Sequence, residues 1–161
     1  MKRYLLIGLT IVPLAIGQWA LSGDIGPSLA DDILRTLDFA LSSTDMDTLN
    51  ATPISIVQAP GTGKYNIIDR VTCFNDFNST SFNLGMGTLD FRYSNSSGSL
   101  LARVPGACLG VSSDAYCAVY GQDAMSIANA AIVAHASEDV TAGNGTLRCR
   151  VYYKTITASD I

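Results

Sequence analysis

The sequence predicts a mostly β protein, an antiparallel β-sandwich of the jelly-roll type, with an N-terminal apolar arm and one short helix. Runs in which apolar and polar residues alternate recur through the last two thirds of the chain, which is the pattern of half-buried strands. Clusters of Gly, Pro, Asn and Ser separate these runs, and no long helical pattern lies between them. We expect three segments: an arm over residues 1–23, a short helix and linker over 24–48, and the sandwich over 49–161.

The first segment joins a basic start to an apolar run. Lys2 and Arg3 precede apolar residues 4–16, and small residues follow as far as Gly23. A secretory signal has the same layout, and the run is short for a membrane span and interrupted by Gly and Pro. We expect an uncleaved arm that packs against other protein, with a membrane contact as the minor alternative. The expected partner contacts are Leu5, Leu6, Ile7, Leu9, Ile11 and Trp19, joined by Ile33 and Leu37 of the next segment.

The second segment has the apolar spacing of one helix face. Leu29, Ile33, Leu37 and Leu41 recur at every fourth position, and Pro27 suits a first helical turn. Two aspartates follow Pro27 at positions where they interact favourably with a helix dipole. We therefore expect a short surface helix that packs its Leu/Ile stripe on the core.

After the helix the pattern changes to short strands separated by turns. Residues 53–57 alternate between apolar and polar, and Pro and Gly within 59–63 predict a turn. Residues 64–76 are rich in β-branched and aromatic side chains, which favour strands. Residues 88–94 place Leu, Phe and Tyr on one side and Asp and Arg on the other. Each of the three segments is predicted to be a strand.

Four further strands are expected in the second half of the chain. Residues 100–104 form one that a Pro-Gly pair ends, while 115–120 and 127–134 are so rich in alanine that one of them could be helical. Residues 146–156 form the best-defined strand. They follow an Asn-Gly turn and alternate strictly between an apolar and a polar set.

Composition limits the class of function. The chain is 48% hydrophobic and only 15% charged, which suggests a protein that buries more of itself in neighbours than a free monomer does. A compact β domain with a Ser/Thr/Asn surface is the alternative. The net charge is −4 and no cluster of Lys and Arg occurs, so the basic stripe that nucleic-acid binding needs is absent.

The four cysteines lack the paired spacing of a zinc site. Cys73 and Cys149 fall at inward positions of predicted strands and are interpreted as small core hydrophobes. Cys108 and Cys117 flank one loop, so the question of a disulfide between them stays open. Assembly in a reducing cytoplasm argues against it.

Catalytic and cofactor motifs are incomplete. Residues 59–64 end like a phosphate-binding loop, but Tyr65 stands where a magnesium-binding Ser or Thr is needed, and a strand follows instead of a helix. His135 is the only histidine, and with Glu138 it falls short of a metal site. The acidic pairs do not have the spacing of a calcium loop. We expect a protein that is not an enzyme and has no cofactor or metal.

Three stretches carry a resemblance to known proteins. They are LNATPISIVQAPGTGK over 49–64, TLDFRY over 88–93 and TAGNGTLRCRVYY over 141–153. The segment 49–156 that contains them is about two thirds of the chain, and it resembles the small capsid decoration, or cement, proteins of tailed bacteriophages. This resemblance implies a virion protein on the capsid surface, assembled in the host cytoplasm, with the major capsid protein and copies of itself in a homotrimer as partners. The arm and the helix lie outside the matched region.

Two alternatives remain. The protein could belong to the tail or the head–tail junction of the same kind of particle. It could instead be a secreted carbohydrate-binding β-sandwich module, in which Tyr116, Tyr120 and Tyr152 stack on sugars. The secreted alternative predicts cleavage near residues 20–23 and a disulfide between Cys108 and Cys117.

Overall fold

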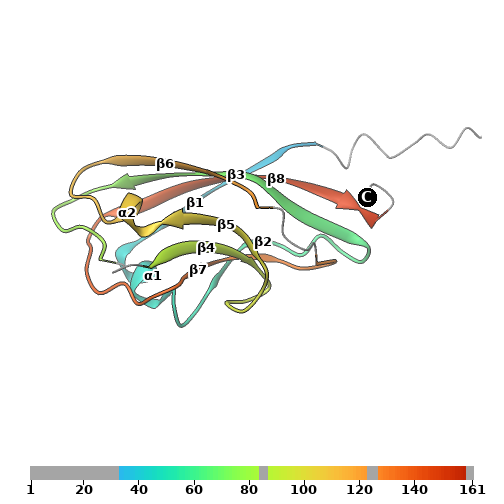
Figure 1. Ribbon diagram of the computed structural model, residues 1–161, viewed down its shortest axis with the longest axis horizontal. Coiled ribbons are helices and arrows are strands. Elements are labelled where there is room, and N and C mark those ends of the chain that lie inside the picture. Colours follow the sequence, from blue (N-terminus) through green and yellow to red (C-terminus); the bar gives the residue numbers. More distant parts are fainter. Residues whose placement is uncertain (1–32, 84–86, 123–126, 159–161) are drawn as a thin grey trace, which may run out of the picture.

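The computed structural model describes residues 33–83, 87–122 and 127–158. Two four-stranded antiparallel sheets lie one on the other, as the sequence predicts for a β-sandwich (Figure 1). In chain order the elements are β1 (Arg35–Leu41), α1 (Ser43–Thr48), β2 (Ile54–Val57), β3 (Lys64–Asp76), β4 (Thr88–Tyr93), β5 (Leu100–Pro105), α2 (Gly106–Leu109), β6 (Ala115–Tyr120), β7 (Ile132–Ala136) and β8 (Thr146–Thr157). The first sheet has the order β1-β8-β3-β6, and the second sheet has the order β2-β7-β4-β5.

The longest pairing in the molecule joins β3 to β8. It is interrupted once, by a bulge at Asp69 between Ile68 and Arg70. Before the bulge Asn66 and Ile68 are buried, and after it the buried residues of β3 include Val71. The extra residue shifts the alternation by one, so both halves of the strand turn their buried set toward the second sheet.

The core fills the space between the two sheets. Leu89, Phe91 and Tyr93 of β4 point inward from the second sheet, and all three are at most 1% exposed. Burying a side chain of this size contributes roughly 1.5–3 kcal/mol relative to leaving it in water. Tyr93 also donates a hydrogen bond from its hydroxyl to the backbone oxygen of Asn66, 2.5 Å away, so the core spans both sheets without an unpaired phenol.

The helix predicted over residues 27–41 is wrong in its described part. Arg35–Leu41 is strand β1, antiparallel to β8 at the edge of the first sheet. Leu37 and Leu41 are four residues apart, and this spacing fits about one turn of a helix as well as two repeats of the two-residue period of a strand. Phe39, which packs against the core between them, fits only the strand period.

Among the described residues, the first helix comes after β1. It is α1, and Ser42 caps its N-terminus in a capping box with Asp45. The Asp45 carboxylate accepts from the Ser42 backbone N–H at 2.8 Å, and the Ser42 hydroxyl accepts from the Asp45 N–H at 3.2 Å. Within the described residues no helix is long and apolar enough to cross a bilayer.

The other predicted strands are confirmed with small shifts of their ends, except that the strand predicted over 127–134 begins five residues later, at Ile132. Both alanine-rich segments are strands, β6 and β7: β6 alternates between inward and outward side chains, whereas β7 is buried at every position except His135. The predicted turn over 59–63 is also confirmed, with Gly61 at φ +101° and Gly63 at φ +72°. The sequence did not indicate the four-residue helix α2, which directly follows Pro105.

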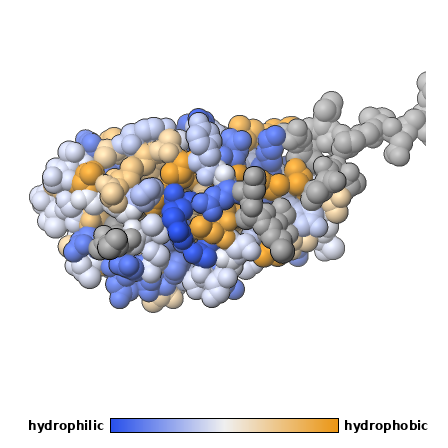
Figure 2. Space-filling view, in the orientation of Figure 1, coloured by the Kyte–Doolittle hydropathy of each residue, from blue (hydrophilic) through white to orange (hydrophobic). Residues whose placement is uncertain are grey.

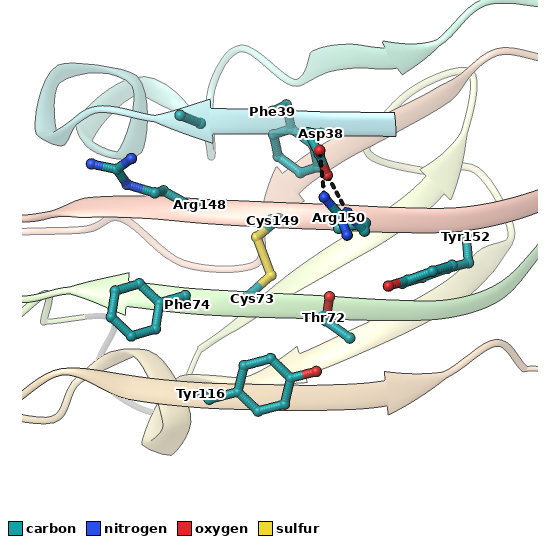
Figure 3. A pocket seen from close by; sticks show the side chains of 11 residues that line it. Asp38, Phe39, Thr72, Cys73, Phe74, Tyr116, Arg148, Cys149, Arg150 and Tyr152 are labelled. Carbon is teal, nitrogen blue, oxygen red and sulfur yellow. Dashed lines mark hydrogen bonds and ion pairs between the residues drawn. A yellow bond between two sulfur atoms is a disulfide. The ribbon is translucent and has the colours of Figure 1, made fainter. Parts of the chain in front are cut away.

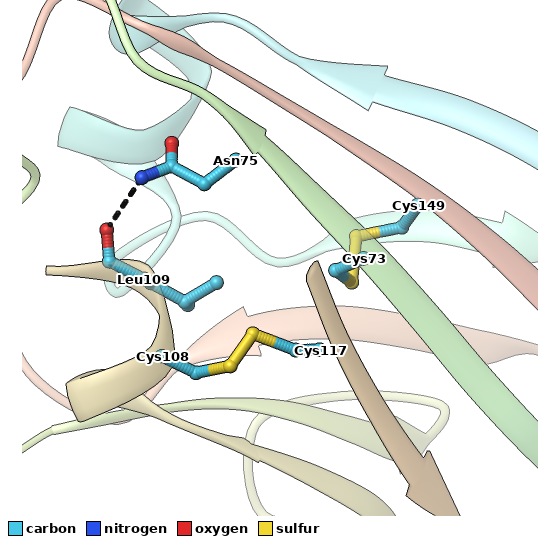
Figure 4. Close-up of a disulfide and its surroundings, with 6 residues drawn as sticks. All are labelled: Cys73, Asn75, Cys108, Leu109, Cys117 and Cys149. Atoms are coloured by element: carbon cyan, nitrogen blue, oxygen red, sulfur yellow. Dashed lines mark hydrogen bonds between the residues drawn. A yellow bond between two sulfur atoms is a disulfide. The ribbon is translucent and has the colours of Figure 1, made fainter. Parts of the chain in front are cut away.

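Two disulfides join the described cysteines. One links Cys73 of β3 to Cys149 of β8, and the other links Cys108 of α2 to Cys117 of β6 (Figure 4). Cys73 and Cys149 are buried as predicted, but their interpretation as unpaired hydrophobes is wrong, because the register places them opposite each other. The sequence left the pairing of Cys108 with Cys117 open, and in the structure the two form a disulfide.

Removing the two disulfides separately is expected to cost different amounts. Cys73 and Cys149 are 76 residues apart, and Cys108 and Cys117 are 9 apart. Loop-closure entropy then gives about 4.5 kcal/mol for the first bond and about 2.6 kcal/mol for the second. Urea unfolding of C73A/C149A and C108A/C117A, without reductant, measures both. Equal losses, or a larger loss for the second pair, would contradict the loop-length argument.

Candidate functional site

The outward-pointing side chains of the first sheet form a regular array, which we call the outer face. Because the four strands are in register, these side chains lie in three rows that cross the sheet in the order β1, β8, β3, β6. The rows are Ala40, Arg148, Phe74 and Tyr116; then Asp38, Arg150, Thr72 and Ala118; then Thr36, Tyr152, Arg70 and Tyr120.

The middle row has small side chains where it crosses β3 and β6. Thr72 and Ala118 are small, whereas their neighbours in the rows on either side are aromatic rings or arginines. A hollow of about 600 Å³ lies on the outer face, and Thr72 is part of its lining, whereas Ala118 is not. Figure 3 shows Thr72 at its centre, with the rings of Phe74, Tyr116 and Tyr152 around it.

The rings on the outer face are open to solvent. Tyr116 is 66% exposed, Tyr120 is 75% exposed and Phe74 is 38% exposed. Exposed tyrosine together with arginine is the composition of binding surfaces, which are otherwise poor in charge. Hydrophobic residues also reach the surface among hydrophilic ones on the face drawn in Figure 2, as expected for a chain with so few charges.

Two ion pairs and a ring contact fix the charged side chains of the outer face. Arg150 donates to both carboxylate oxygens of Asp38, from Nε at 2.5 Å and from Nη2 at 2.7 Å. These hydrogen bonds hold the pKa of Asp38 below its usual value and raise that of Arg150. Arg148 pairs with Asp76 at 2.9 Å, and the Arg70 guanidinium lies 4.4 Å from the centre of the Tyr152 ring.

The charge of the outer face differs in sign from that of the chain. Its three rows contain three arginines (70, 148 and 150) and one aspartate (38), and Asp76 on the same side of β3 pairs with Arg148, so together they carry a formal charge of 3 − 2 = +1. The whole chain carries −4. The outer face therefore favours anionic groups over cationic ones.

A second charged cluster, in the second sheet, serves the fold. The Asp90 side chain is fully buried and accepts from Arg92 at 2.6 Å, from Arg103 at 2.8 Å and from the Thr88 hydroxyl at 2.8 Å. Burial alone would raise the pKa of Asp90, but the hydrogen bonds from Arg103, Thr88 and Arg92 outweigh it and lower that pKa. With every carboxylate oxygen occupied, this cluster has no open position for a ligand.

His135 lies beside this cluster, one residue before the end of β7 and opposite Asp90. Burial and the positive charge of Arg92 lower its pKa, so the imidazole is neutral at pH 7. In the described part of the chain no three His, Cys, Asp or Glu side chains come together as a metal would require. We therefore interpret His135 as a residue that packs beside the Asp90 ion cluster.

The predicted partner-contact residues are only partly placed. Those of the arm, Leu5, Leu6, Ile7, Leu9, Ile11 and Trp19, lie outside the described residues. Ile33 is 58% exposed just before β1, and Leu37 of β1 is partly buried against the core, so neither belongs to the outer face.

Three tyrosines that the sequence analysis gave as candidate sugar-binding residues lie on the outer face. Tyr116 and Tyr152 lie on opposite sides of the hollow, and Tyr120 stands at the end of the third row, outside it. The other contributors, Phe74, Arg148 and Arg150, were not singled out. Their outward positions in alternating strands were readable, but their proximity depends on the register of strands far apart in sequence.

Comparisons with known proteins give one similar structure. No protein-family model matches the chain, and no curated protein matches it. A chain of the cyanophage Pam1 capsid asymmetric unit superposes with a TM-score of 0.50 at 13% sequence identity. The match covers 89% of this chain and 99% of that one, and at this identity it shows a shared fold.

The Asp90 cluster is expected to matter for stability. Asp90→Asn keeps the shape but removes the charge that two arginines share, so the free energy of unfolding at pH 7 should fall by about 2–4 kcal/mol. The contribution of the low Asp90 pKa is present above about pH 4, the usual value for Asp, and is lost as the pH falls through the lowered value. The variant should lack this loss.

Urea unfolding between pH 7 and pH 2 measures both effects. The matched control is Asp38→Asn, which removes an equally bidentate partner of an arginine, but one whose side chain is 64% exposed. The control should change stability little, because exposed ion pairs contribute little. Equal losses for the two variants would show that burial of Asp90 is not the cause.

Proposed function

We propose that this chain is a structural protein of a phage particle, a decoration or cement protein bound to the capsid. The observation that carries this proposal is the shared fold with a chain of a cyanophage capsid asymmetric unit, matched over 99% of that chain. Short sequence motifs that resemble phage decoration proteins point the same way. A surface poor in charge suits a protein that is partly covered by neighbours.

We infer further that the sandwich is a jelly roll. The first strand lies beside the last in one sheet, and the second lies beside the seventh in the other. Eight strands wound into two four-stranded sheets in this way correspond to the jelly roll that recurs in viral capsid proteins and in lectins. The topology agrees with a shell protein, and the sandwich would act as its rigid body.

The proposed mechanism is mechanical. The arm residues Leu5, Leu6, Ile7, Leu9, Ile11 and Trp19, with Ile33 and Leu37, would pack on the major capsid protein and on other copies of this chain in a homotrimer. Each Å² of apolar area removed from water contributes ~25 cal/mol, less the cost of association. Contacts that cross subunit boundaries raise the energy needed to separate the shell. Assembly would take place in the host cytoplasm, on the capsid surface.

A second candidate, a secreted carbohydrate-binding β-sandwich module, is favoured by one observation. The disulfide between Cys108 and Cys117 is the bond that this alternative predicts, and disulfides persist in oxidising compartments. Intact mass of the natural protein decides between the two, because secretion also predicts cleavage near residues 20–23. Immunogold labelling of particles separates the head from the tail and the head–tail junction.

Deletion of residues 1–23 is expected to abolish binding to purified shells that lack this protein. The apolar contact surface is lost, whereas the hydrogen-bonded sandwich begins at β1 and should stay folded. Co-sedimentation with the shells measures binding, and near-ultraviolet circular dichroism checks the fold.

A point variant provides a matched control for the deletion. L9D/I11D introduces two charges within the apolar run and should also prevent binding, whereas S28D adds a charge beyond it and should not. A truncated protein that still decorates the shells would remove the arm from the mechanism. Labelling confined to the tail would overturn the assignment to the capsid.

A further inference from the structure

We propose that the hollow on the outer face binds an anionic oligosaccharide, one whose sugar rings carry carboxylates. The site goes beyond the structural role proposed above and does not depend on it, since the outer face belongs to the sandwich itself. Three observations support the proposal: the rings around the hollow, the polar groups at its floor, and its charge.

The rings are placed as sugar-binding surfaces require. Tyr116 and Tyr152 come from β6 and β8, two strands that flank β3, and they stand on opposite sides of Thr72 (Figure 3). Phe74 adds a third ring next to Tyr116. The C–H face of a pyranose packs on an aromatic ring, and the exposed Tyr116 ring is open to such a contact. Tyr152 already has the Arg70 guanidinium over one face of its ring, so a sugar would have to use the other face. Rings at both sides of one hollow can contact successive sugars of a chain.

The floor supplies hydrogen-bonding groups in fixed positions. Thr72 presents a hydroxyl at the centre and is itself only 8% exposed. The ion pair between Arg150 and Asp38 engages Nε and Nη2 and leaves Nη1 outside it, and a hydrogen bond with the Tyr152 side chain also holds the guanidinium in place. Arg148 uses only Nη2 in its pair with Asp76. Guanidinium groups held in this way bind carboxylates and sugar hydroxyls without first losing side-chain freedom.

Charge decides which oligosaccharide fits. With Asp76 counted, the face carries a formal +1 on a chain of −4. Arg148 and Arg150 each have one carboxylate partner, and a ligand carboxylate beside either of them would gain a charge-assisted hydrogen bond that a neutral sugar cannot make. A protein partner fits less well, because the lowest part of the face is a hydroxyl and an ion pair. A protein anchor would need an apolar pocket there.

The test is isothermal titration calorimetry on the full chain with three probes. Tetragalacturonate is the anionic sugar, cellotetraose is the neutral sugar, and tetraglutamate has the charge without the rings. Binding of tetragalacturonate at least tenfold tighter than binding of either other probe supports the site. Equal binding of tetraglutamate would overturn it, because charge alone would then suffice, and so would no binding of tetragalacturonate at millimolar concentration.

Two tyrosines on one strand give a matched pair of variants. Tyr116→Ala should weaken tetragalacturonate binding at least tenfold, and Tyr120→Ala, on the same face but outside the hollow, should change it less than twofold. Both side chains are mostly exposed, so neither change should affect folding. Arg148→Gln should remove most of the preference for the anionic sugar over cellotetraose.

The variants also separate this site from the proposed function. If Tyr116→Ala abolishes co-sedimentation with shells while tetragalacturonate does not bind, the outer face is a protein interface and the sugar site is wrong. If sugar binding follows the expected pattern while the chain is found outside particles, the site stands and the structural role does not. Unchanged tetragalacturonate binding in Tyr116→Ala would rule out the hollow as the location.

Discussion

Strands β3 and β8 are joined along twelve register pairs, and most of the molecule is arranged around this pairing. On its inner side, it sets Cys73 opposite Cys149 and so permits the disulfide that covalently joins the two strands. On its outer side, it sets Thr72 opposite Arg150, and this places a small residue next to an arginine. A slip of one residue would reverse both sides at once and send arginines into the core. The burial of the inner set therefore also determines the outer face.

The two sheets use their charges differently. In the second sheet, Asp90 is buried beneath Arg92 and Arg103 and has all its hydrogen bonds within the protein. In the first sheet, Asp38 and Arg150 pair in the open, with side chains 64% and 50% exposed. A buried cluster satisfied on every side fixes the fold but binds nothing more. An exposed pair costs little to maintain and keeps groups available to a ligand. This contrast is the reason to look for function on the first sheet.

Periodicity in the sequence was enough to predict the fold class and most strands, and it failed where two periods coincide. Leu37 and Leu41 satisfied a helix and a strand equally, and only β8, more than a hundred residues later in the chain, settles the choice by pairing with β1. The disulfide between Cys73 and Cys149 was missed for a related reason, since it needs the register of two distant strands. Pairing of Cys108 with Cys117 could at least be considered, because nine residues separate them. Local patterns identify elements, and long-range pairing decides what they bring together.

The hollow is the clearest case of this limit. Its rings were partly visible in the sequence as tyrosines at strand positions, but the space between them also needs the small Thr72 side chain at its centre. A larger side chain at position 72 would fill the space and leave the same rings and arginines on a flat surface. A search for reactive or charged residue types cannot find such a site, because its defining property is the volume that a small side chain leaves unoccupied. The disulfide directly behind it, between Cys73 and Cys149, holds β3 and β8 together, so the spacing of Phe74 and Tyr152, which these two strands carry, is set before any ligand arrives.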